Sequence, residues 1–156
     1  MSPKGRPEGE SAPKRGSAEG SPGAGAGCLF CALVAGKIPA RRVWEDAAHV
    51  AFFPLKHIEP GHTLLVPKRH AEYVFDMASD DYQALWGAAK RVAPAIRAVT
   101  GAARVGIAVE GFSVPHVHVH LVPINALNDL NPAREQAIAD ERADALAAAL
   151  QAALRA

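Results

Sequence analysis

The sequence lacks long apolar runs and has almost no excess of charge of either sign. No stretch is long enough to cross a bilayer, and the first residues include no hydrophobic segment like that of a signal peptide. Lysine and arginine number 17 against 16 acidic residues, so no broad basic surface for nucleic acid or an anionic membrane is expected. We therefore expect a cytoplasmic protein that binds neither nucleic acid nor membranes.

The N-terminal region lacks large apolar side chains after Met1. Residues 1–27 hold seven glycines, four prolines and four serines, and such a segment cannot bury enough surface to offset the entropy lost on ordering. The remaining residues are numerous and apolar enough to form one domain with a core. We predict a disordered tail over 1–27 and a single folded domain over 28–156 that ends in a helix.

Cysteine is scarce, because the sequence contains only Cys28 and Cys31. Their C-x-x-C spacing suits a redox-active pair or half of a tetrahedral zinc site, and two free thiols are a third interpretation. No second C-x-x-C is present to complete a zinc site, so the motif alone leaves these alternatives open.

Runs of β-branched and aromatic residues bounded by turn signals predict five strands. They are expected at residues 42–45, 49–53, 62–67, 104–109 and 114–123. Short turns between consecutive strands imply antiparallel pairing, and two longer helices would cover one face of the sheet. The predicted fold class is therefore α+β, with a five-stranded antiparallel sheet and flanking helices.

Three helices are predicted around these strands. A short one follows the cysteines and ends at Gly36. A long one has Ser79 as its N-cap and stops at Gly101, and Pro94 is expected to kink or loosen it. The Asn131-Pro132 pair predicts the start of a last, alanine-rich helix that reaches toward the end of the chain.

Three alternating histidines form the most informative stretch of the sequence. His116, His118 and His120 are separated by valines within a run of high β-propensity. Side chains two residues apart in a strand share a face, so the three imidazoles are expected to line one surface of the fifth strand. Because a row of titratable rings is costly without a role, the pattern favours a metal site or nucleophilic catalysis over ordinary histidines.

Both chemistries fit the residues near these histidines. Same-face neighbours in a strand lie about 7 Å apart, so two histidines converge on one ion more easily than three, with His70 as a further candidate ligand. A neutral imidazole can instead attack phosphorus and form a covalent adduct while a second imidazole stabilises the phosphate charge. Gly111 and Ser113, in the turn before the histidines, offer close backbone approach and a hydroxyl donor to a phosphate.

These motifs resemble those of the histidine triad (HIT) superfamily. The alternating run from His116 to Val122 matches the His-φ-His-φ-His-φ-φ signature, and the opening Cys28–Cys31 and the block Pro60–Lys68 agree in order and spacing. The resemblance covers residues 28 to about 125. It implies a five-stranded HIT fold, a homodimer, and a nucleotide hydrolase or transferase that acts at the α-phosphate.

The resemblance also implies roles for individual residues. His118 would be the nucleophile that carries a covalent nucleotidyl group, while His120 and Ser113 would contact the phosphate or leaving group. The partner would be a purine nucleotide or a nucleotide conjugate, such as a nucleoside phosphoramidate or a dinucleoside polyphosphate. The nucleotide-binding residues implied are Leu29, Phe30, Phe52, Leu55, Gly111 and Ser113.

Some HIT-like proteins bind structural zinc through the opening C-x-x-C and two histidines. The matching positions in this sequence are Cys28, Cys31, His70 and His116. The resemblance therefore favours zinc over a redox pair. A site closed by four protein ligands would be structural and would tie the first helix to the histidine strand.

Two positions depart from the family pattern. Pro54 stands where many members carry an acid for the ribose hydroxyls, and Phe112 stands where many carry a glutamine. These departures favour an alternative function, a non-catalytic nucleotide-binding or scaffold module of the same fold. A third alternative is a metal-dependent hydrolase in which the histidines hold a catalytic ion.

Overall fold

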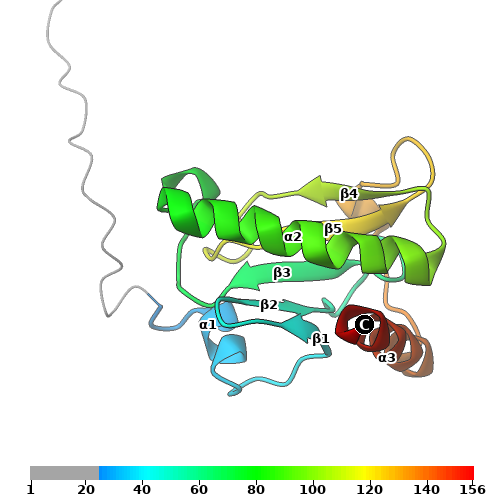
Figure 1. The fold of residues 1–156 in the computed structure, drawn as a ribbon, viewed down its shortest axis with the longest axis horizontal. Helices are drawn as coiled ribbons and strands as arrows, with labels where there is room; N and C mark the ends of the chain where they lie inside the picture. Colours follow the sequence, from blue (N-terminus) through cyan, green and yellow to red (C-terminus); the bar gives the residue numbers. More distant parts are fainter. Residues whose placement is uncertain (1–24) are drawn as a thin grey trace, which may run out of the picture.

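The computed structural model describes residues 25–156, so most of the predicted tail, residues 1–24, lies outside the described residues. Five antiparallel strands form one sheet in the order β1-β2-β3-β5-β4 (Figure 1). This confirms the predicted α+β fold class. The strands are β1 (Arg42–Glu45), β2 (His49–Phe52), β3 (Thr63–Pro67), β4 (Arg104–Ala108) and β5 (Val119–Ile124).

Three α-helices pack against this sheet, and none within residues 25–156 is long and apolar enough to cross a bilayer. Figure 1 shows α2 lying across the sheet, with α3 beside it near β1. The helices are α1 (Leu29–Val34), α2 (Ser79–Thr100) and α3 (Asp140–Arg155), with short 3₁₀ turns η1 (Val74–Asp76) and η2 (Pro132–Arg134).

The two faces of the sheet bury two separate apolar clusters. On one face, Ala51 and Leu65 pack in a single cluster with Leu85 of α2 and Leu150 of α3. On the other face, the neighbouring side chains of β2 and β3 pack with Phe30 of α1. Successive side chains of a strand point to opposite faces, so these central strands are apolar throughout. The long helices and α1 therefore lie on opposite sides of the sheet.

The fifth strand begins later than the sequence predicts. It starts at Val119 rather than at Val114, so His116 and His118 precede it and only His120 lies within it. The amide of Val117 donates to the Ala71 carbonyl (2.7 Å) in the loop after β3. The prediction of three histidines evenly spaced along one strand is therefore wrong, and two of them sit on an irregular segment that is anchored separately.

Two helix starts also differ from prediction. The N-cap of α2 is Ala78, with no side-chain cap, and Ser79 is the first helical residue. Asn131 does accept a hydrogen bond as a cap, but from the Ala133 amide (3.0 Å), so it begins η2 rather than α3. In both cases packing of the buried helix face against the sheet, rather than the capping residue, decides where the long helix starts.

The long helix ends as predicted but is not broken by its proline. Pro94 lies inside α2, which continues to Thr100. Val92 and Ile96, on either side of it, are fully buried, and their packing offsets the hydrogen bond that proline cannot make. Gly101 then terminates the helix in the left-handed conformation (φ 71°), which glycine adopts without a Cβ penalty.

Candidate functional site

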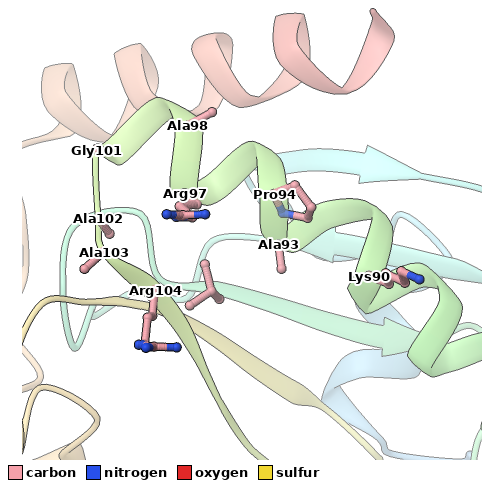
Figure 2. A pocket seen from close by; sticks show the side chains of 10 residues that line it. Lys90, Ala93, Pro94, Arg97, Ala98, Gly101, Ala102, Ala103 and Arg104 are labelled. Carbon is pink, nitrogen blue, oxygen red and sulfur yellow. The ribbon is translucent and has the colours of Figure 1, made fainter.

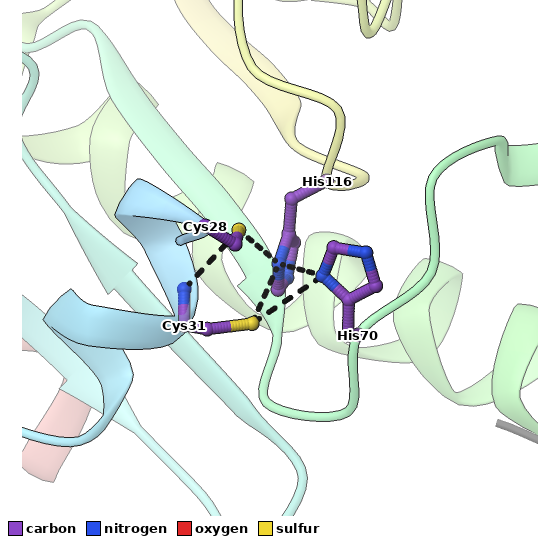
Figure 3. A group of neighbouring side chains, drawn as sticks. All are labelled: Cys28, Cys31, His70 and His116. Carbon is purple, nitrogen blue, oxygen red and sulfur yellow. Dashed lines mark hydrogen bonds between the residues drawn. The ribbon is translucent and has the colours of Figure 1, made fainter. Parts of the chain in front are cut away.

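Four potential metal ligands converge at one end of the sheet. Cys28 and Cys31 come from α1, His70 from the loop after β3, and His116 from the segment before β5 (Figure 3). Their ligand atoms all lie within 4.8 Å of one another. The structure thus brings together all four residues of the predicted metal set, although His70 and His116 are 46 positions apart in the sequence.

The separations between these atoms fit a tetrahedral ion. His116 Nδ1 lies 3.4 Å from Cys28 Sγ, 3.5 Å from Cys31 Sγ and 3.2 Å from His70 Nδ1. Zinc held at its usual bond lengths by two thiolates and two imidazoles places ligand atoms about 3.3–3.8 Å apart. The cluster can therefore accept a small tetrahedral cation with little rearrangement of its side chains.

Hydrogen bonds outside the cluster direct the ligand nitrogen of His116 inward. His116 Nε2 donates to the Pro67 carbonyl (2.8 Å), which leaves the Nδ1 lone pair facing the two sulfurs. For His70, Nε2 lies 3.8 Å from Glu72 Oε1, too far for a hydrogen bond but on the side away from the cluster. A hydrogen bond thus orients His116 as a ligand, whereas His70 Nε2 has no hydrogen-bond partner among residues 25–156.

The surroundings of Cys31 disfavour its thiolate form in the absence of a cation. Burial, with the hydrogen bond and charge of Cys28, raises the pKa of Cys31 to about 11. A bound cation would supply the positive charge that this pair otherwise lacks.

His118 is oriented by a backbone carbonyl. Its Nδ1 lies 2.7 Å from the His116 carbonyl oxygen, which can only accept, so Nδ1 carries the proton and Nε2 keeps its lone pair. The ring is 3% exposed and packs edge-on against Phe30 at a centroid distance of 5.1 Å. The arrangement leaves the lone pair of His118 Nε2 free of any partner among residues 25–156.

A histidine given no role by the sequence analysis fixes the opposite tautomer in His120. The Ile58 amide donates a hydrogen bond to Nδ1 of His62 (3.0 Å), so the ring proton of His62 is on Nε2. This Nε2–H donates a hydrogen bond to Nδ1 of His120 (2.9 Å). Consequently His120 Nε2 carries a proton and is a hydrogen-bond donor. The sequence feature that could have pointed to His62 is its place in the Pro60–Lys68 block, directly before a buried strand.

Burial keeps these imidazoles neutral at pH 7. It lowers the pKa of His62 to about 3, with further contributions from His120 and His57, and that of His120 to about 4, with a contribution from His118. His57 directly precedes Ile58 in the same loop. Its pKa is also lowered to about 4, by burial and then by the charge of Arg41. His62 and His120 therefore act as neutral hydrogen-bond donors and acceptors rather than as ions.

The residues predicted to bind nucleotide fall into two groups. Phe30 and Phe52 are buried side by side on the face of α1, with ring centroids 5.6 Å apart. Leu29 is half-exposed, and Leu55 is 95% exposed in the loop after β2. Phe30 thus packs directly against His116 and His118, and Phe52 packs against Phe30.

The turn before the histidines has the backbone shape that glycine permits. Gly111 has a φ of 83°, and a Cβ at this position would lie 3.3 Å from the Glu72 carbonyl oxygen. Ser113 is exposed in the same turn, and the neighbouring Phe112 is 92% exposed. The hydroxyl of Ser113 is therefore accessible from solvent at the entrance to the histidine segment.

A separate cleft of about 1010 Å³ lies between the second half of α2 and the start of β4. Figure 2 shows Lys90 and Arg97 of α2 and Arg104 of β4 among alanines and Pro94. Its lining includes none of the residues predicted to bind nucleotide or metal.

Comparison with known proteins agrees with this geometry. The sequence matches the family model described as HIT domain over residues 35–127, more than half of the chain. The chain belongs to the HIT family. This confirms the family identified from the motifs.

The similarity of this HIT protein to curated proteins and solved structures extends over most of its described residues. Protein hit of Bacillus subtilis is 35% identical over 103 residues, which are 62% of this chain and 70% of that protein. The adenosine 5'-monophosphoramidase hnt1 of Schizosaccharomyces pombe is 31% identical over 101 residues, 62% of this chain and 73% of that protein. A crystal structure of a Zn-bound histidine triad family protein from Mycobacterium smegmatis has a TM-score of 0.71 at 28% identity, covering 83% of this chain and 94% of that one.

The lowered histidine pKa values predict that acid destabilises the fold. An imidazole with a pKa of 6.5 when unfolded and about 4 when folded binds its proton more readily in the unfolded state. Its contribution of up to about 3 kcal/mol is present above pH 6.5 and is lost as the pH falls toward 4. We expect the free energy of unfolding, measured with urea, to fall over this range.

The His57→Phe variant tests the origin of this effect. It removes one of the three titrating rings, so its unfolding free energy should depend less steeply on pH, by up to about 1.4 kcal/mol per pH unit. Both proteins keep the cysteine–histidine cluster, so acid effects there cancel in the comparison. Parallel curves for the variant and the wild type would contradict this assignment.

Proposed function

We propose that this HIT protein is a nucleotide hydrolase or nucleotidyl transferase that acts at the α-phosphate through His118. The observation that carries the proposal is the pair of opposite tautomers, with a lone pair at His118 Nε2 and a proton at His120 Nε2. The two rings lie close together, with centroids 5.1 Å apart. A nucleophile and a hydrogen-bond donor are therefore held side by side, with their tautomers fixed by a main-chain carbonyl and by His62.

The first step forms a bond between His118 Nε2 and the α-phosphorus while the bond to the leaving group breaks. His120 Nε2–H donates to a phosphate oxygen and stabilises the negative charge of the transition state. Ser113 supplies a second donor to the phosphate or to the leaving group. The developing positive charge on His118 is spread over its ring and stabilised by the Nδ1–H bond to the carbonyl of His116.

The second step replaces His118 by water or by another acceptor. Attack on the same phosphorus breaks the phosphorus–nitrogen bond and regenerates the neutral imidazole. Phe30 and Phe52 provide an apolar wall beside the histidines for the nucleoside part of a purine nucleotide or nucleotide conjugate. The phosphoramidase hnt1 supports an adenosine phosphoramidate as the first substrate to test.

A catalytic ion held by the three histidines has less support. Only His116 points a ring nitrogen toward the other metal ligands, whereas Nδ1 of His118 and Nδ1 of His120 are occupied by a carbonyl and by His62. The non-catalytic alternative rests on Pro54 and on Phe112, whose side chain is exposed where a glutamine donor stands in many relatives.

Replacement of His118 by alanine should abolish turnover of adenosine 5'-phosphoramidate, because no other ring nitrogen can form the adduct. We expect kcat/KM to fall by about 10⁴-fold or more. The matched control is His49→Ala, which truncates another buried histidine whose ring contacts Asp46. Intact mass spectrometry with a slow substrate should detect a nucleotidyl adduct on the wild type alone.

The outcomes separate the candidate functions. Equal turnover by wild type and His118→Ala would reject His118 as the nucleophile. Nucleotide binding by the wild type without turnover across a panel of phosphoramidates and dinucleoside polyphosphates would favour the non-catalytic module. Activity lost on chelation while the protein stays folded would favour a catalytic metal.

We further propose that the cysteine–histidine cluster holds one structural zinc ion. Four protein ligands close the tetrahedron, so the ion supplies folding energy rather than an open coordination position. The zinc-bound relative from Mycobacterium smegmatis supports the choice of metal. Held this way, Cys28 and Cys31 fasten α1, and with it Phe30, to the segment that carries His118.

Metal analysis of the purified protein should find one equivalent of zinc. His70→Ala should retain well below one equivalent and should melt at a lower temperature, because only three ligands remain to hold the first helix. His49→Ala should keep the full equivalent. Less than one equivalent in the wild type after exposure to zinc would rule the site out.

We also propose a homodimer formed through β4. This strand lies at the edge of the sheet with β5 on one side, and its outward-pointing Ile107 is 45% exposed. An open strand edge pairs readily with a second copy, and the adjoining cleft beside α2 would then receive side chains of that copy.

The Ile107→Asp variant should therefore be monomeric. A buried carboxylate without a partner is costly at such an interface, and light scattering should give half the wild-type mass. Leu127→Asp is the matched control, because Leu127 is 93% exposed in a loop after β5, and it should remain dimeric. A monomeric wild type would contradict the proposal.

A further inference from the structure

His57 is a buried histidine that the proposed reaction does not use. It is 2% exposed, and its Nδ1 has no hydrogen-bond partner among residues 25–156. An unpaired buried polar atom costs about 1–3 kcal/mol, which the packing of this ring must offset. Its position in the fold therefore calls for an explanation.

The backbone of His57 is fastened to the chain after β5. Its amide and carbonyl form an antiparallel pair with Gln136, both hydrogen bonds being 2.9 Å long. Two residues further on, Glu59 forms an ion pair with Arg134. The loop between β2 and β3 is thus held from outside at two points on either side of Ile58, whose amide sets the tautomer of His62.

The ring of His57 packs against His62, the donor of the hydrogen bond to His120. It stands edge-to-face to His62, with centroids 6.3 Å apart and planes at 87°, and edge-to-face to Phe53 at 5.1 Å. His62 is fully buried, and its other flat neighbour is His120, at 5.2 Å. His62 is therefore enclosed between two imidazoles, one of which belongs to the reacting pair.

We propose that His57 is a positioning residue that holds the plane of His62 so that its Nε2–H points at His120. The ring acts as a flat wall, because its contact with His62 is edge-to-face packing. Without that wall His62 can tilt, its bond to His120 weakens, and His120 no longer presents a fixed Nε2–H to the phosphate. This inference rests on the proposed function, in which His120 stabilises the phosphate charge.

Two substitutions of His57 distinguish the packing of the ring from the chemistry of its nitrogens. His57→Ala removes the wall and should lower kcat for adenosine 5'-phosphoramidate about tenfold, with KM changed by less than about twofold. His57→Phe keeps a flat ring of similar size and should restore kcat to within about threefold of the wild type. His49→Ala, an equal truncation of a buried histidine bonded to Asp46, should leave kcat unchanged.

A second readout does not depend on turnover. Long-range ¹H–¹⁵N spectra report which ring nitrogen of each histidine is protonated, and the wild type should show His62 as the single Nε2–H tautomer. His57→Ala should show a mixture of tautomers or a broadened Nε2–H signal, and His57→Phe should show the wild-type pattern. If the wild type has no turnover, the proposed function fails while these spectra still decide the role of His57.

The proposal is overturned if His57→Ala keeps both the kcat of His49→Ala and the single His62 tautomer. It is also overturned if His57→Phe is as impaired as His57→Ala, because the ring nitrogens would then matter rather than the wall. Loss of kcat by His49→Ala to the same extent would assign the effect to general destabilisation.

Discussion

The arrangement of the site depends on one kind of interaction, the hydrogen bond between a buried imidazole and a main-chain group. The carbonyl of Pro67 accepts a hydrogen bond from His116, the carbonyl of His116 accepts one from His118, and the amide of Ile58 donates one to His62. Because a carbonyl only accepts and an amide only donates, each bond fixes which ring nitrogen is free. In the proposed function these bonds give chemically identical side chains different roles as metal ligand and nucleophile, and His62 in turn fixes His120 as the donor.

The fold makes this possible by separating its two apolar clusters. The long helices α2 and α3 complete a core on one face of the sheet, which leaves the other face to α1 and the histidines. Stability and chemistry are thus placed on opposite sides of strands β2 and β3, whose residues are apolar toward both. The helix α1 has only six residues, and the proposed zinc ion on its two cysteines would add to the packing of Phe30 that keeps it against the sheet.

Much of this arrangement could be predicted from the sequence, and the failures have a common cause. Alternation and turn signals located the strands, and the resemblance to the HIT superfamily implied the four members of the metal cluster, because these signals depend on residue type and order. They could not show that β5 starts only at Val119, since Val114 to His118 has the same β-propensity whether or not the sheet has a place for it. His62 and His57 were missed because a buried histidine has a role only through its neighbours, and those neighbours come from distant parts of the chain.

The use of main-chain partners has a consequence for how such a site can change over evolution. A side chain that orients a catalytic ring can be deleted by one nucleotide change, but a peptide carbonyl or amide cannot. Replacement of His116 would remove a metal ligand yet leave in place the oxygen that orients His118. The tautomer of His118 is therefore set by the path of the chain, whereas that of His120 also depends on the side chain of His62. Pro54 and Phe112 take part in neither bond, so these positions can diverge while both tautomers are kept.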